Sequence, residues 1–204
     1  MSSISALWWF IPLAFLLVFL RFYRVWLLYY LAGTSGLAYL LTQLLTRVVD
    51  VRAGLAASVA SSAHTILGLA QIETQVAQNA PGVLLVLVVT QRVGWTVLQI
   101  GVESSGLLEM VVFASLVAFY PGWSAGQRLV RGAAGLLLTW GANILRMVII
   151  AGMLHFFGKE ALVLAHTFIG KLVFFVLTLA IYWATITAPS IGDLEKRFAS
   201  GGRL

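Results

Sequence analysis

The chain has 204 residues, of which 61% are hydrophobic and only 10% are charged, and its formal net charge is +6. About a quarter of the residues in an ordinary soluble domain are charged, so this chain lacks the polar surface that water requires. The composition excludes such a fold and indicates an integral membrane protein, with one membrane-embedded domain over residues 1–204.

The basic residues lie between the apolar runs, where they act as topology signals rather than as a nucleic-acid surface. The chain has no cysteine, which excludes disulfides and thiolate metal sites. Its three histidines, His64, His155 and His166, lack the spacing of metal ligands. We therefore expect a lipid bilayer as the surroundings, and no nucleic acid, metal or cofactor as a partner.

Residues 1–72 are predicted to form the N-terminal helices. The apolar run from Leu7 to Leu20 has no basic stretch before it and no small-residue cleavage site after it, which favours a retained span over a cleaved signal peptide. The run over residues 25–46 is interrupted at Gly33–Gly36, and is either a second span or a bent helix partly in the interface. The run from Ala53 to about Leu69 is rich in Ala and Ser, which favours close packing inside a bundle.

Residues 73–100 differ from the rest because short β-branched runs are separated by Gly, Pro and polar residues. This pattern predicts a short extracytoplasmic segment resembling a β-hairpin, which forms an outer cap on the bundle. The alternative is one imperfect span from Val83 to Ile100 with Arg92 buried in it, which is energetically costly.

Residues 101–187 are predicted to form the core helices, and residues 188–204 a cytoplasmic tail. Apolar runs extend from Leu107 to about Tyr120, from Gly132 to Phe157, and from Thr167 to Thr187. The predicted fold is an all-α polytopic membrane protein, a bundle of five or six transmembrane helices in the plasma membrane.

Positive charge orients this bundle. Arg128 and Arg131 lie in one loop, and the basic C-terminal tail follows two spans later, so both are expected in the cytoplasm. Arg146 lies 15 residues beyond Arg131, a helical rise of about 22 Å, which brings it near the outer boundary. Residues 101–106 and His166 then face outward with it. For the N-terminal half the side stays open. If residues 25–46 do not fully cross, the arginines that fit the cytoplasm are Arg21, Arg24, Arg47 and Arg52; if they cross, Arg21 and Arg24 are outside.

Three polar positions at this outer level are candidates for chemistry. An arginine inside a span is costly, so Arg146 either snorkels or pairs with a carboxylate, or it is held to stabilise an oxyanion. Asn143 precedes it by three residues and shares its helix face. His166 is either an interfacial cap or a general base. His64 and His155 have no comparable neighbours and are predicted to be structural.

The motif "ESSGLLEM" opens the span at Leu107. Ser104 or Ser105 is either a helix N-cap or a nucleophile. Glu103 and Glu109 fit the first turn, where the helix dipole favours anions, and Glu109 is also placed to reach Arg146 or Lys171. Lys171 follows His166 by about 1.4 α-helical turns, so the two are expected on different faces.

Taken in order, "ESSGLLEM", "NILR" and "AHTFIGKLVFF" resemble the motifs of the exosortase/archaeosortase family of membrane-embedded sorting transpeptidases. The family pattern has a Cys-Ser-Gly or Cys-Thr-Gly motif entering a span, then Asn-x-x-Arg on the following span, then a His or a second Arg at the start of a later one. The resemblance covers roughly residues 80–187 and is closest to the compact bacterial members, which have a Glu before the catalytic Cys.

The resemblance implies that residue 104 is the nucleophile position, that Arg146 stabilises the oxyanion and that His166 transfers the proton, with Asn143, Glu103 and Glu109 in support. The chain departs from the family at the nucleophile, since Ser104 stands where the family has Cys. Either a Cys→Ser substitution is present or the natural protein has Ser. The absence of any other cysteine favours a substitution of a single native Cys.

The resemblance further implies the substrate and the reaction. Secreted precursor proteins, held by a C-terminal sorting signal and transmembrane helix, would be cleaved at the outer membrane face through an acyl-enzyme, which an amine or lipid acceptor or water resolves. Two rival functions are an intramembrane-type serine protease that uses Ser104 with His166, and a non-enzymatic membrane assembly protein.

Overall fold

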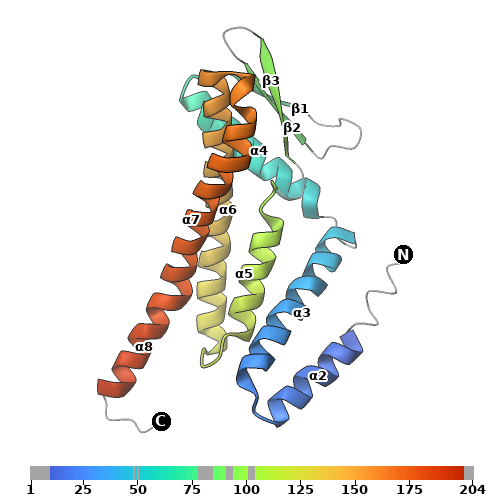
Figure 1. Cartoon of the computed structure of the whole chain (residues 1–204), viewed down its shortest axis with the longest axis vertical. Coiled ribbons are helices and arrows are strands. Elements are labelled where there is room, and N and C mark those ends of the chain that lie inside the picture. The colour runs from blue at the N-terminus through green and yellow to red at the C-terminus, as the bar shows by residue number, and fades with distance from the viewer. Residues whose placement is uncertain are drawn as a thin grey trace.

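The computed structural model describes residues 10–47, 49, 51–77, 85–90, 94–100 and 104–199. Over these residues the chain is mostly helical, with six helices and one small sheet. The helices form an elongated bundle, and the sheet lies at one end of it (Figure 1). The turns at residues 23–25 and 120–124 lie at the opposite end (Figure 1). We call the two ends of the bundle the sheet end and, after a residue near the second turn, the Arg128 end.

The helices account for most of the sequence on both sides of the sheet. They are α2 (Phe10–Phe22), α3 (Trp26–Arg47), α4 (Val51–Leu69), α5 (Leu107–Phe119) and α6 (Ala125–Phe157), followed by a composite helix. The composite helix comprises the 3₁₀ turn η1 (Lys159–Ala161), the π turn η2 (Leu164–Ile169), α7 (Gly170–Tyr182), the π turn η3 (Trp183–Thr187) and α8 (Ala188–Ala199).

Helix α3 is continuous through Gly33–Gly36, so these residues interrupt the apolar run but not the helix. The two glycines serve helix packing. A Cβ added to Gly33 would overlap the ring of Phe119 on α5, and one added to Gly36 would overlap the side chain of Leu13 on α2. Their bare backbones allow α3 to approach both neighbours closely, as small residues do in membrane bundles.

The segment predicted to resemble a hairpin contains that strand pair and one further strand. β1 (Thr74–Ala77), β2 (Leu85–Thr90) and β3 (Trp95–Ile100) form an antiparallel sheet in the order β1-β2-β3. In the register, Val76 faces Leu87 and Leu87 faces Leu98. The alternative of one helical span over residues 83–100 is therefore wrong. Arg92 lies outside the described residues.

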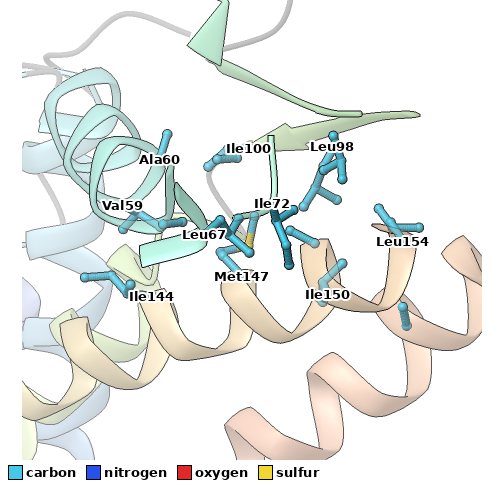
Figure 2. Close-up of a cluster of buried hydrophobic side chains, with 14 of the residues drawn as sticks. Val59, Ala60, Leu67, Ile72, Leu98, Ile100, Ile144, Met147, Ile150 and Leu154 are labelled. Carbon is cyan, nitrogen blue, oxygen red and sulfur yellow. The ribbon is translucent and has the colours of Figure 1, made fainter. Parts of the chain in front are cut away.

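One hydrophobic core joins the sheet to the helices. The small face of α4 packs on α6 and on the strands, with Ala56, Ala60 and Ala63 fully buried. Figure 2 shows Val59 and Leu67 of α4 beside Met147 of α6, with Ile100 and Leu98 of β3 above them. The close packing predicted for this Ala-rich helix is confirmed on one face, which lies against α6 and the sheet, while its other face is exposed. A second core of apolar side chains lies among α5, α6 and α7.

Helix α6 begins at Ala125, seven residues before the predicted start at Gly132. The reason is a capping box, in which Ser124 Oγ accepts from the Gln127 amide at 3.3 Å and Gln127 Oε1 accepts from the Ser124 amide at 2.9 Å. These bonds satisfy amides that a helix start leaves open. Arg128 and Arg131 are therefore in the first two turns of α6 rather than in a loop.

The composite helix does not end where the tail was predicted to begin. It continues through Pro189 as α8 to Ala199. Proline has no amide hydrogen and its ring crowds the preceding turn of an α-helix. The wider π turn η3 lies immediately before Ala188 and relieves this crowding.

Two helices in the described ranges are long and apolar enough to cross a membrane, Ala125–Phe157 and Lys159–Gly192. Shorter apolar helices cover Ile11–Phe22 and Leu107–Phe119. Large apolar side chains are exposed along the bundle, including Phe15, Leu129 and Phe175. The start of α3 packs on the end of α5 through Tyr29 and Phe119, whose ring centroids are 5.6 Å apart.

The contact between Tyr29 and Phe119 puts the start of α3 beside the end of α5. Arg21 and Arg24 precede that start. Both arginines lie at the Arg128 end, and α3 runs from there towards the other end (Figure 1). Because α3 is a full helix, Arg21 and Arg47 lie towards opposite ends of the bundle. The side of a membrane that each end faces stays a prediction.

Candidate active site

The turn before α5 is formed by Ser104, Ser105 and Gly106. Gly106 has φ 77° and ψ 7°, a left-handed conformation that costs residues with a Cβ. Ser105 Oγ accepts a hydrogen bond from the Leu107 amide at 3.3 Å. Ser105 thus supports the helix start, and Ser104 is not needed for that task.

Asn143 of α6 holds this turn in place. Its side chain is fully buried, and Nδ2 donates to the Ser104 carbonyl oxygen at 2.8 Å. A Cβ at Gly106 would lie 3.2 Å from the Asn143 side chain, so only glycine fits without displacement. The resemblance implies that Asn143 supports Arg146 at the oxyanion, and that role stays a prediction. The described contact of its amide is with the backbone of the turn, which it helps to position.

Arg146 lies one turn after Asn143 on α6 and is 8% exposed. Its Cζ lies 5.1 Å from the ring centroid of Phe174 on α7. A guanidinium over an aromatic face is stabilised electrostatically, and more so where water is excluded. Phe174 therefore helps to fix the orientation of the cation between α6 and α7.

His166 lies in the π turn η2, near the start of the composite helix. A π turn bonds residue i to residue i+5 and is often found at functional sites. The wider turn brings residues five apart onto nearly the same face. For this reason His166 and Lys171 both line one pocket, and the expectation that they face differently is wrong.

The pocket has a volume of about 430 Å³ and lies between the Ser104 turn, α6 and the composite helix. Its lining residues are Ser104, Leu108, Glu109, Arg146, His166, Lys171, Phe174, Phe175 and Thr178. Glu109 Oε2 is buried there and accepts no hydrogen bond within the described part of the chain. The pocket combines a hydroxyl, a guanidinium, an imidazole and a carboxylate, the group types used in acyl transfer.

Glu103 is outside the described residues. The two histidines predicted to be structural do not line the pocket. His64 joins α4 to β1, with its Nδ1 2.6 Å from Thr74 Oγ1. His155 packs edge-on against the adjacent Phe156 of α6, at 5.1 Å between ring centroids.

The sequence did not lead us to predict that one face of α7 lines the pocket. Lys171, Phe174, Phe175 and Thr178 recur at the i, i+3, i+4, i+7 spacing of one helix face. This spacing was available in the sequence, but Phe174 and Phe175 were hidden in a uniformly apolar run.

Comparison with known proteins found no relative of this chain. The chain matches no protein-family model, and no curated protein and no solved structure matches it.

Proposed function

We propose that the chain is a multi-pass plasma-membrane enzyme of the exosortase/archaeosortase type, a protein-sorting transpeptidase or protease with its nucleophile at position 104. The observation that carries the proposal is the shared pocket of Ser104, Arg146 and His166. These residues come from three motifs spread over more than 60 positions of the sequence. Their convergence in one pocket is expected of a catalytic site and is not required by any local packing need.

The exterior of the bundle supports placement in a bilayer. Phe15 is 74% exposed, Leu129 74% and Phe156 74%, and a soluble protein rarely exposes so much contiguous apolar surface. In this proposal α2, α3, α5, α6 and α7 cross the membrane, and α4 and the sheet cap the bundle. The Arg128 end is basic, so it faces the cytoplasm with the C-terminus, and the Ser104 pocket faces outward.

The proposed reaction uses a cysteine at position 104, as in the family that the sequence resembles. The thiolate sulfur attacks the scissile carbonyl carbon, and the carbonyl π electrons move to the oxygen, which Arg146 stabilises. When the tetrahedral intermediate collapses, the C–N bond breaks and the imidazolium of His166 gives its proton to the leaving nitrogen. An acceptor amine then attacks the thioester, its proton passes to His166, and the sulfur leaves as thiolate.

Glu109 has a role in the second half of this reaction. A buried carboxylate oxygen with no hydrogen-bond partner among the described residues is costly. An incoming amine acceptor supplies the missing donor, so Glu109 binds the acceptor nitrogen and directs it towards position 104. The expected substrates remain secreted precursors that carry a C-terminal sorting signal and transmembrane helix.

The decisive experiment introduces Ser104→Cys into the full chain. Because the chain has no other cysteine, this variant contains a single thiol, and iodoacetamide reports on that thiol alone. A free thiol is only about a few per cent ionised at neutral pH. Beside a guanidinium and an imidazole the reactive thiolate is more abundant, so alkylation at pH 7 should be about tenfold faster than in the same variant with Arg146→Ala or His166→Ala.

Ser105→Cys is the matched control, because Ser105 is adjacent but fully buried and does not line the pocket. It should react slowly and should not respond to Arg146→Ala. Equal rates for Ser104→Cys with and without Arg146 and His166 would contradict the proposed site. Cleavage is then tested by co-expressing Ser104→Cys with secreted reporters that end in a candidate sorting motif, an apolar helix and a basic tail.

A serine protease is the second candidate, favoured by the presence of Ser104 itself in a pocket with His166. A fluorophosphonate probe would label Ser104 in that enzyme, and Ser104→Ala would abolish the label. No labelling together with reporter cleavage by Ser104→Cys supports the cysteine enzyme. A non-enzymatic assembly protein would not require the three residues to meet, and their shared pocket argues against it.

A further inference from the structure

A second pocket lies at the Arg128 end, with a volume of about 670 Å³. The α2–α3 turn forms one side of it and the α5–α6 turn the other, and Figure 1 shows both turns at the end of the bundle away from the sheet. It is lined by Arg21, Trp26, Tyr29, Tyr30, Ala118, Phe119, Pro121, Gly122 and Arg128. Nothing in the proposed reaction uses it.

The charge of this pocket is positive and uncompensated. Arg21 and Arg128 come from separate turns, and among the described residues no carboxylate lines the pocket with them. Arg21 lies over Trp26 and Tyr29, with Cζ 5.8 Å and 6.0 Å from their ring centroids. Arg128 donates from Nη2 to the Tyr120 carbonyl oxygen at 3.1 Å, and its Nε is buried with no hydrogen-bond partner among the described residues.

These contacts place two guanidinium groups beside one cavity. Arginine presents a planar set of donors that matches the oxygen atoms of a phosphate, and binds it through two parallel hydrogen bonds. The buried Nε of Arg128 is such a donor without an acceptor in the described part of the chain. The ligand that satisfies it must carry negative charge and several acceptor oxygens.

We propose that this pocket binds a phosphate-bearing anion, and that Arg21 and Arg128 hold its phosphate group. The aromatic side chains that line the pocket indicate which kind of molecule carries the phosphate. Trp and Tyr concentrate at the headgroup level of a bilayer, and Trp26, Tyr29 and Tyr30 line this pocket together. Anionic phospholipids gather at basic surfaces on the cytoplasmic leaflet. The headgroup of an anionic phospholipid, with its acyl chains against the apolar outside of α2 and α3, therefore fits the pocket better than a soluble phosphate does.

The test uses the purified full chain in a neutral detergent, with thermal unfolding measured during titration. One arm adds short-chain phosphatidylglycerol, a second adds phosphatidylcholine, and a third adds inorganic phosphate. Saturable stabilisation by phosphatidylglycerol is expected. Arg21→Gln and Arg128→Gln should each weaken its apparent affinity at least about fivefold, the effect expected for one lost basic contact.

Arg47→Gln is the matched control, because Arg47 is an exposed arginine at the far end of α3 and does not line the pocket. It should leave the affinity unchanged. Arg21 is itself exposed, so Arg21→Gln keeps the fold even if Arg128→Gln does not. Stabilisation by inorganic phosphate that matches that by phosphatidylglycerol would support a soluble phosphate ligand at the same site. Equal affinity in all variants, or equal effects of phosphatidylglycerol and phosphatidylcholine, would overturn the proposal.

Discussion

The turn around Ser104 depends on two residues that do no chemistry in the proposed reaction. Gly106 supplies the left-handed backbone and Asn143 binds the Ser104 carbonyl from the neighbouring helix. Both are parts of the same short motifs, "SSG" and "NILR", that contain the proposed catalytic residues. Each motif thus combines a reactive group with the residue that positions it.

Gly106→Ala should destabilise the protein by about 1–2 kcal/mol, because alanine is strained at positive φ, and should also slow alkylation of Ser104→Cys by displacing Asn143. Thermal unfolding and the alkylation rate would be measured together. Gly94→Ala separates the loss of stability from the displacement of Asn143, because Gly94 has φ 96° but an added Cβ there would have no atom within 4 Å. Gly94→Ala should destabilise without slowing alkylation, and a slowed reaction there would contradict the role given to Asn143.

Asn143→Ala removes the hydrogen bond that α6 donates to the Ser104 carbonyl oxygen. Leaving a buried carbonyl without its donor costs about 1–3 kcal/mol. The unfolding temperature should fall, and Ser104→Cys should react more slowly although Arg146 and His166 are still present. If Asn143→Ala lowers stability but leaves the alkylation rate unchanged, the residue supports the fold and does not position the nucleophile.

At the scale of elements, the glycines decide how closely the helices pack. A Cβ at Gly135 of α6 would overlap the ring of Phe113 on α5, whereas Gly141 on the same helix has nothing within 4 Å of its added Cβ. Gly135→Ala should therefore cost about 1–3 kcal/mol through overpacking. Gly141→Ala should be neutral or slightly stabilising, because alanine favours helix by about 1 kcal/mol over glycine. Thermal unfolding of the two variants in one detergent makes the comparison, and similar losses would contradict this packing.

The π turn η2 is the element that sequence patterns did not reveal. Inserting one alanine after the exposed residue Phe168 separates His166 from Lys171 by one further position, and one residue is about 100° of rotation in an α-helix. His166 should then leave the face that carries Lys171, and Ser104→Cys should lose the rate advantage that His166 provides. Phe168→Ala keeps the spacing and is the control. Unchanged reactivity after the insertion, with helicity retained by circular dichroism, would show that the helix face on which His166 lies is not required.

The sequence predicted well what depends on local chemistry. The Ser-Ser-Gly turn before an apolar run predicted the start of α5 at Leu107, and the alanines of α4 predicted its close packing. It failed where a distant partner decides the outcome. The choice between a second span and a bent helix stayed open at Gly33 because Phe119, which occupies the space beside it, lies 86 positions away in sequence. The third strand was missed for the same reason, because a four-residue strand such as β1 is recognisable only by its partner β2.

For the whole molecule, the distribution of charge over the two ends predicts the orientation in the membrane. Single cysteines at Gly126 near the start of α6 and at Gln75 on β1 would be exposed at opposite ends, in a chain with no other thiol. In intact cells a membrane-impermeant maleimide should label Gln75→Cys, and Gly126→Cys should react only after lysis. Labelling of both variants from outside would exclude the proposed orientation.

The bond from Asn143 to Ser104 has one more consequence, for how a bulky substrate enters. It ties the α5 turn to α6, so position 104 and Arg146 belong to one rigid half of the site. His166 belongs to the other half of the site, on the composite helix. Only 17% of the most apolar 18-residue stretch of that helix is buried. In the proposed reaction, a substrate helix arriving from within the lipid would therefore meet catalytic groups on two separate elements, with position 104 and Arg146 on the α5–α6 side and His166 on the composite helix.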